Sequence, residues 1–102
     1  MSTFCIDIDG TLCGITEDHN YHLAIPYNDM IRAVNNLYDA GHYIKIFTAR
    51  GMCSGMEYEI LTYQQLNKWG VKFHELIMNK PSADYYVDDK GLTPEQFLAM
   101  VI

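Results

Sequence analysis

The peptide TFCIDIDGT, residues 3–11, joins a short apolar run to two aspartates, Asp7 and Asp9, and then to Gly10. Residues i and i+2 of a strand share a face, so both carboxylates point the same way where the strand leaves its sheet, and a glycine lets the backbone turn sharply there. Two neighbouring negative charges must be neutralised, and Mg²⁺ suits them because it prefers oxygen ligands. The peptide therefore predicts a strand over Thr3–Asp7 with a magnesium-binding turn at its end.

Size and composition place the chain among ordinary globular proteins. Its 102 residues predict one domain, residues 1–102, and its content of 49% apolar and 20% charged residues argues against disorder. The net charge of −6, with only seven Lys and Arg, disfavours nucleic-acid binding. We expect a cytoplasmic protein that does not enter a membrane, because no run approaches the ~18 apolar residues of a span and no signal sequence is recognisable. The three cysteines, Cys5, Cys13 and Cys53, form no CxxC pair, so we expect reduced thiols.

Apolar periodicity predicts the order βαβαβ, then a fourth strand and a closing helix. The predicted strands are Thr3–Asp7, Tyr43–Phe47, Phe73–Met78 and Tyr85–Val87, and the predicted helices run from Tyr27 to Gly41, from Glu57 to Trp69 and from Pro94 onward. Strands that alternate with helices form parallel sheets with helices on both faces. We therefore predict an α/β fold, a Rossmann-like doubly wound three-layer α/β/α sandwich with a mainly parallel sheet of four to five strands.

Polar side chains follow each of the four predicted strands. They are Asp7 and Asp9, then Thr48, then Lys80, then Asp88 and Asp89. Ligands of parallel sheets bind beyond the carboxyl ends of the strands, so we expect these residues to converge on one rim. Carboxylates, a hydroxyl and an ammonium are the groups that phosphoryl transfer with Mg²⁺ uses. One carboxylate can attack phosphorus, a second can move the proton, and the hydroxyl, the ammonium and nearby backbone N–H groups can hold the phosphate oxygens.

The same residues resemble, in order, the four motifs of the haloacid dehalogenase (HAD) superfamily of phosphohydrolases. The DxDGT motif matches Asp7–Thr11, and the later motifs match Thr48, Lys80 and the pair Asp88–Asp89. The resemblance covers nearly the whole chain, and the residues around Thr48 and Lys80 look like those of small bacterial or phage members linked to sugar-phosphate metabolism. It implies an HAD-like phosphatase with Mg²⁺ as cofactor. The segments between the motifs are too short for the cap domain of larger members, so the resemblance is to a capless one.

The resemblance also implies a role for each residue. Asp7 would be the nucleophile and Asp9 the general acid/base. The phosphate-binding residues would be Gly10, Thr48, Ala49 and Lys80, and the metal would be held by Asp7, by Asp9 through its backbone carbonyl, by Asp88, and by Asp89 directly or through water.

Several residues keep a second interpretation. Arg50 could recognise a second anionic group of the substrate, or it could simply pair with an acid on the surface. The pair Asp88–Asp89 could be turn residues, and the first motif alone could be a fragment of a calcium loop. His19 and His22, in the long loop after the first strand, could touch a leaving group or be ordinary loop residues.

Without a cap the site would be open. It would then accept a large substrate, take a cover from another subunit of a homo-oligomer, or rely on the loops at 13–25 and 51–56. The sequence leaves these alternatives open, and substrate specificity would lie in those loops.

The leading hypothesis is an Mg²⁺-dependent phosphomonoester phosphatase that forms an aspartyl-phosphate on Asp7 and acts on a sugar phosphate or another small phosphorylated metabolite. One alternative is a receiver-like signalling domain, which also gathers acids, Thr, Lys and Mg²⁺, although its motif order differs. Another is a catalytically idle HAD-like binding protein. A nucleotide is the second choice of substrate after a sugar phosphate. Polynucleotide phosphatase activity ranks lower, because the acidic balance of the chain disfavours nucleic acid.

Overall fold

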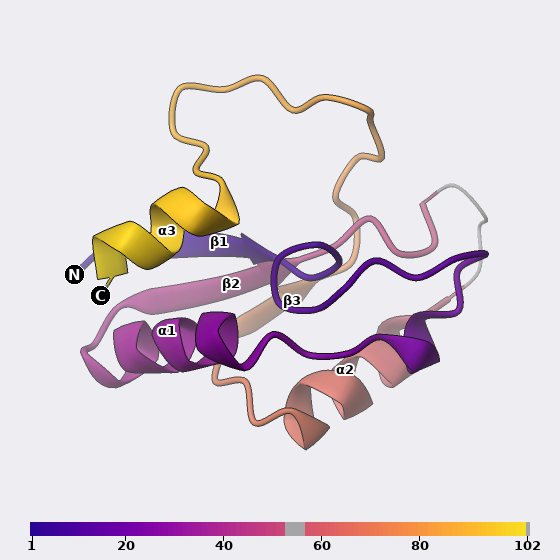
Figure 1. Cartoon of the computed structure of the whole chain (residues 1–102), viewed down its shortest axis with the longest axis horizontal. Coiled ribbons are helices and arrows are strands. Elements are labelled where there is room, and N and C mark those ends of the chain that lie inside the picture. The colour runs from indigo at the N-terminus through magenta and orange to yellow at the C-terminus, as the bar shows by residue number, and fades with distance from the viewer. Residues whose placement is uncertain (53–56, 102) are drawn as a thin grey trace.

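Three parallel strands and three α-helices make up the part of the chain that the computed structural model describes, residues 1–52 and 57–101 (Figure 1). In chain order the elements are β1 (Thr3–Asp7), the short 3₁₀ helix η1 (Tyr21–Leu23), α1 (Asn28–Asp39), β2 (Tyr43–Phe47), α2 (Glu59–Lys68), β3 (Glu75–Ile77) and α3 (Pro94–Val101). The first three predicted strands and the three predicted helices are confirmed, although β3 is shorter and α2 begins later than predicted. Cys53 and most of the predicted loop at 51–56 lie outside the described residues.

The strands lie in the order β1-β2-β3, and each neighbouring pair is parallel. Asp7 at the end of β1 is paired with Phe47 at the end of β2, and Phe47 is paired with Ile77 at the end of β3. The three strands therefore end at the same edge of the sheet. This edge is where ligands bind in open parallel sheets.

The hydrophobic core lies on one face of this sheet. Ile6 of β1 and both isoleucines of β2, Ile44 and Ile46, are buried. The alternate residues of β1, Thr3 and Cys5, are exposed on the other face. Alternate burial of this kind is typical of a strand with one face in solvent. β1 therefore differs from the prediction, in which both faces of the sheet are buried.

The helices cover the buried face. α1 buries Met30, Ile31, Ala33 and Val34, and α3 contacts α1 and packs Phe97 edge-to-face against Phe4 of β1. The Asn35 side chain of α1 donates to the carbonyl oxygen of Gly70, just after α2, which ties these two helices together. The described sheet is therefore covered by helices on one face, and the third layer of the predicted sandwich is not formed by these residues.

The fourth strand predicted at Tyr85–Val87 is wrong. Residues 78–93 contain neither strand nor helix, and Figure 1 shows them as a loop that rises away from the sheet before α3. Tyr85 and Val87 are 86% and 95% exposed. Length alone does not explain the difference, because β3 also has three residues. Here the Tyr86 hydroxyl bonds within the loop, to the carbonyl oxygen of Pro81. The sheet therefore has fewer strands than the four to five predicted.

A capping box starts α3, close to the predicted beginning of this helix at Pro94. The backbone N–H of Gln96 donates to Thr93 Oγ1 (3.2 Å), and the backbone N–H of Thr93 donates to Gln96 Oε1 (3.0 Å). Pro94 occupies the first helical position, where its missing N–H costs nothing. Among the described helices, none has the length and apolar character needed to cross a membrane.

The centre of the core should be sensitive to truncation of Ile46, which is fully buried on the middle strand. Ile46→Ala is expected to lower the free energy of unfolding by about 2–5 kcal/mol, because it removes buried methyl groups and leaves a cavity. Urea denaturation would measure the loss. Ile60→Ala on α2 is the matched control, since Ile60 is 76% exposed, and it is expected to change stability by less than about 0.5 kcal/mol. Equal losses in the two variants would contradict this account of the core.

Candidate active site

The predicted site residues begin where the three strands end. Asp7 is the last residue of β1, Thr48 directly follows β2, and Lys80 lies three residues beyond β3. All three line one cavity of about 430 Å³, together with Asp9 and Ala49. The structure therefore brings together the residues of the first three predicted motifs.

Asp7 is paired with Lys80. Its Oδ2 lies 3.2 Å from Lys80 Nζ, and its Oδ1 accepts a hydrogen bond from the backbone N–H of Ile8 (2.9 Å). The Lys80 side chain is only 10% exposed, and its ammonium also lies over the rings of Phe47 (4.6 Å) and Tyr86 (4.1 Å). Contacts of this kind with aromatic faces stabilise a desolvated cation. The ammonium is thus held beside one carboxylate oxygen of Asp7, at the edge of the sheet where the three strands end.

Asp9 is paired with Arg50 in a bidentate arrangement. Arg50 Nε lies 2.9 Å from Asp9 Oδ2, and Arg50 Nη2 lies 2.9 Å from Asp9 Oδ1. The Arg50 side chain is 0% exposed, whereas that of Asp9 is 22% exposed. The structure shows Arg50 paired with an acid, but the arginine is fully buried and its partner Asp9 is only partly exposed, so this is not a pair on the surface.

Arg50 is also held from its other side. Its Nη1 donates to Thr62 Oγ1 (3.1 Å) and to Gln65 Oε1 (2.6 Å), both on α2, and its guanidinium carbon lies 4.5 Å from the centre of the Tyr21 ring. Sequence reasoning missed Thr62 and Gln65. The available signal was the spacing of two polar residues on the face of α2 that also buries Leu66.

The thiol of Cys13 is a further neighbour of Asp9. Cys13 is buried, and its Sγ lies 3.6 Å from Asp9 Oδ1. Burial, with the negative charge of Asp9 as the next cause, raises the pKa of the Cys13 thiol to about 12. The thiol therefore stays protonated near neutral pH and can donate to the carboxylate, so Cys13 is a packing residue and not a nucleophile.

The predicted phosphate-binding residues differ in the hydrogen-bond donors that they can present to a phosphate. Thr48 is buried, and its Oγ1 accepts the backbone N–H of Arg50 (3.1 Å), which leaves the hydroxyl proton able to donate. The backbone N–H of Gly10 instead donates to the carbonyl oxygen of Cys13 (2.8 Å), within the turn that the positive φ of Gly10 (+84°) permits. Ala49 lines the cavity. Thr48 and Lys80 are thus the side chains best placed to meet phosphate oxygens.

Asp88 and Asp89 lie in the loop between β3 and α3 and are exposed. Asp88 Oδ1 accepts the backbone N–H groups of Lys90 (2.7 Å) and Gly91 (2.6 Å), so it closes a turn. In residues 1–52 and 57–101, no group of three or more His, Cys, Asp or Glu side chains is arranged to hold a metal. The predicted convergence of both acids with Asp7 and Asp9 is not seen, because the fourth strand that would carry them is absent. Their role as metal ligands stays a prediction.

The long loop after β1 contributes two aromatic side chains to the cavity. His19 and Tyr21 line it, and His19 Nδ1 lies 3.0 Å from the Tyr21 hydroxyl. His22, the other histidine considered from the sequence, is exposed on η1. Of the two histidines, only His19 therefore lies where it can meet a bound molecule.

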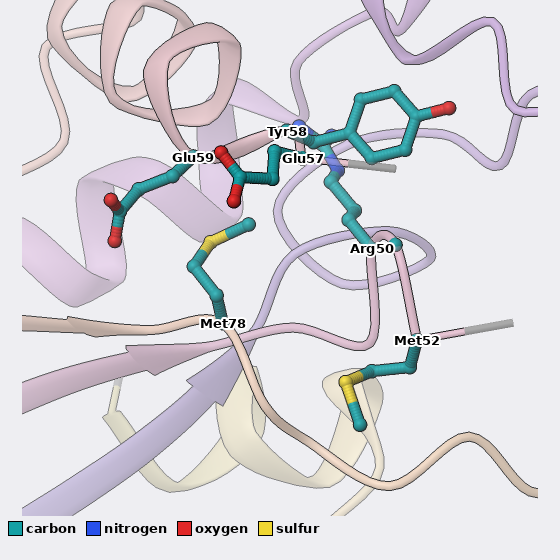
Figure 2. A pocket seen from close by; sticks show the side chains of 7 residues that line it. Arg50, Met52, Glu57, Tyr58, Glu59 and Met78 are labelled. Atoms are coloured by element: carbon teal, nitrogen blue, oxygen red, sulfur yellow. The ribbon is translucent and has the colours of Figure 1, made fainter. Parts of the chain in front are cut away.

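A second, smaller cavity of about 250 Å³ adjoins the first (Figure 2). The two share Arg50 and Gly51 in their linings. Figure 2 shows the carboxylates of Glu57 and Glu59, near the start of α2, on one side of this cavity and Met78, after β3, on another. Its lining combines two glutamates and two methionines with Arg50 and Tyr58, and the predicted catalytic aspartates belong to the larger cavity.

Comparisons with known proteins bear on the fold. No family model matches the chain, and no curated protein matches its sequence. Among solved structures, the chain is similar to a structural-genomics target from Vibrio cholerae, with 26% identity and a TM-score of 0.89 over 98% of this chain and 89% of that one.

Two more distant structures also match. One is the Pnkp1/Rnl/Hen1 complex, with 20% identity and a TM-score of 0.62 over 95% of this chain and 33% of that one. The other is D,D-heptose 1.7-bisphosphate phosphatase from B. bronchiseptica complexed with magnesium and phosphate, with 16% identity and a TM-score of 0.58 over 83% of this chain and 54% of that one. These likenesses show that the chain shares its α/β fold with domains of these two proteins.

Proposed function

We propose that this protein is a phosphomonoester phosphatase that works through an aspartyl-phosphate on Asp7 and acts on a small phosphorylated metabolite such as a sugar phosphate. The observation that carries the proposal is the meeting of Asp7, Thr48 and Lys80, from three different strand ends, in a cavity of about 430 Å³. A distant structural neighbour of the chain is itself a phosphatase, which supports this class of reaction.

The chemistry needs two carboxyl groups. A carboxylate oxygen of Asp7 attacks phosphorus, the bond from phosphorus to the leaving oxygen breaks, and Asp9 gives that oxygen a proton. Water then attacks phosphorus and gives a proton to Asp9, while the electron pair of the bond between phosphorus and Asp7 returns to the carboxylate. Inorganic phosphate leaves, and both side chains are restored.

Lys80 and Thr48 would bind the oxygens of the phosphoryl group. Its oxygens carry negative charge next to the carboxylate of Asp7, and the ammonium of Lys80, 3.2 Å from that carboxylate, offsets the repulsion. The Thr48 hydroxyl can donate to another phosphate oxygen. Thr48 directly follows β2, and its carbonyl oxygen accepts the backbone N–H of Lys80 (3.1 Å). This hydrogen bond, with the ring contacts of the ammonium, keeps both groups in place without a ligand.

Mg²⁺ is part of the proposal as a cofactor. The support is chemical, since paired carboxylates and a phosphate ester are the ligands that Mg²⁺ prefers, and the B. bronchiseptica neighbour was crystallised with magnesium and phosphate. The described arrangement does not fit a site made of all four predicted acids, because Lys80 and Arg50 pair with Asp7 and Asp9 while Asp88 closes an exposed turn. A metal requirement is therefore measured directly, by activity with Mg²⁺ and after treatment with EDTA.

The test is a screen of the purified protein, with Mg²⁺, against a panel of sugar phosphates and nucleotides. We expect release of inorganic phosphate from at least one sugar phosphate, with loss of turnover after EDTA. A stable phosphorylated protein after treatment with a small phosphodonor, without phosphate release, would indicate a receiver-like phospho-acceptor instead. Absence of both turnover and phosphorylation would contradict the proposal and favour an idle binding protein.

A further inference from the structure

The Arg50 side chain contacts Asp9 from the interior of the protein and not from the solvent side. Its side chain is 0% exposed, and two of its nitrogens, Nε and Nη2, are directed at the two carboxylate oxygens of Asp9 at 2.9 Å each. The planar fork of a guanidinium matches a carboxylate in this way and fixes the carboxylate's orientation as well as its distance. Both Nε and Nη2 thus donate to Asp9.

The remaining contacts of Arg50 anchor it to two other parts of the chain. Nη1 donates to Thr62 and Gln65 of α2, and the guanidinium stacks on the ring of Tyr21 from the loop after β1. Figure 2 shows the Arg50 side chain extended from the loop after β2 toward Tyr58 at the start of α2. Arg50 is therefore a rigid link between α2 and the carboxylate of Asp9.

Asp9 needs such a link because no regular element holds it. It lies two residues beyond the end of β1, and its backbone makes only an isolated bridge with Cys13. A general acid/base must lie within hydrogen-bond reach of the oxygen that it serves, and small displacements from that geometry are costly in rate. The contacts with Arg50 and Cys13 set the direction of the Asp9 side chain beside Asp7.

We propose that Arg50 is a positioning residue, which orients Asp9 for proton transfer to and from the leaving oxygen and does not bind the substrate. This inference rests on the proposed phosphatase activity. It predicts that loss of the bidentate contact lowers kcat/KM selectively for substrates whose leaving oxygen needs a proton from Asp9. Protonation by Asp9 matters for an alkyl phosphate, whose alkoxide is a poor leaving group, and matters little for p-nitrophenyl phosphate, whose phenolate leaves readily.

The test compares kcat/KM for an alkyl phosphate and for p-nitrophenyl phosphate in the wild type and in Arg50→Lys. Lysine keeps the positive charge but cannot make the bidentate contact. We expect Arg50→Lys to lose at least about tenfold more kcat/KM on the alkyl phosphate than on the aryl phosphate, and Asp9→Asn to show the same selectivity. Arg32→Lys, an identical change at an exposed position of α1, is the matched control and should leave both values unchanged.

Equal losses on the two substrates in Arg50→Lys would overturn the inference and show a purely structural role. A selective rise in KM for substrates with a second anionic group would overturn it in favour of substrate binding by Arg50. Hydrolysis of neither phosphate by the wild type would instead count against the proposed function itself.

Circular dichroism identifies a variant that fails to fold. If Arg50→Lys does so, Thr62→Val gives a milder test, since it removes one anchor of Arg50 and keeps the shape and burial of the side chain. The same selectivity for the alkyl phosphate, with a smaller loss, is then expected. A Thr62→Val protein that shows no selectivity would overturn the inference.

Discussion

Replacement of Asp7 by asparagine is expected to lower turnover by about 10⁴-fold or more, because an amide cannot form the covalent phospho-intermediate. The fold should survive the change. The amide oxygen can still accept the backbone N–H of Ile8, now 2.9 Å from Asp7 Oδ1, and Lys80 keeps its two aromatic neighbours. Phosphate release on the best substrate of the panel measures the loss, and circular dichroism checks the fold.

Asp18→Asn is the matched control for this experiment. Asp18 is exposed in the loop after β1 and has a φ of +51°, a left-handed conformation that asparagine adopts as readily as aspartate. The control is expected to keep full activity and full stability. Hydrolysis by Asp7→Asn at a rate close to that of the wild type would exclude Asp7 as the nucleophile and leave the aspartyl-phosphate mechanism without support.

The position of the site could be predicted from the sequence because it depends on local patterns. Apolar runs mark β1 and β2, the chain alternates between strands and helices, and parallel strands that are joined by helices end at the same edge. Asp7 ends the first of these strands, Thr48 directly follows the second, and Lys80 lies three residues after the third. The structure places all three around one cavity. Prediction of this arrangement did not require knowledge of any contact between distant parts of the chain.

The loop between β3 and α3 could not be predicted in the same way. The run Tyr85–Val87 has strand-like side chains, but whether three residues pair with an edge depends on the rest of the sheet and not on their own pattern. In the structure they are exposed, and Asp88 turns back on the N–H groups of Lys90 and Gly91. The fourth strand and the meeting of Asp88 with Asp7 both depended on this one assignment.

The partners of Arg50 show a second limit of sequence reasoning. Asp9 is 41 positions away in the chain, and Thr62 and Gln65 have the composition of an exposed helix face. The spacing of Thr62 and Gln65 with Leu66 indicates one face of α2, but it does not identify Arg50 as the residue that packs there. The sequence therefore identified Arg50 as a residue of interest. Its partners could be identified only from the structure, in which α2 packs against the loop after β1.

Lys80→Met is expected to lower kcat/KM by about 10²–10³-fold, the usual effect of removing one preorganised donor from the place where charge develops. The ammonium lies 3.2 Å from Asp7 Oδ2 and is 10% exposed, so water cannot fully replace it between the nucleophile and an incoming phosphate. Methionine has nearly the same length and can keep the contacts with the rings of Phe47 and Tyr86. The loss should therefore come from the missing charge, and both a higher KM and a lower kcat are expected.

Lys90→Met is the matched control, because Lys90 lies in the same loop and is exposed. It should leave kcat/KM unchanged, whereas Lys80→Arg should recover part of the loss by restoring the charge in a different shape. Lys80 would have no part in phosphate binding if Lys80→Met kept the wild-type kcat/KM while Asp7→Asn was inactive. Equal losses in Lys80→Met and Lys90→Met would instead indicate a general effect of positive charge on substrate attraction, which added salt would weaken in both variants and in the wild type.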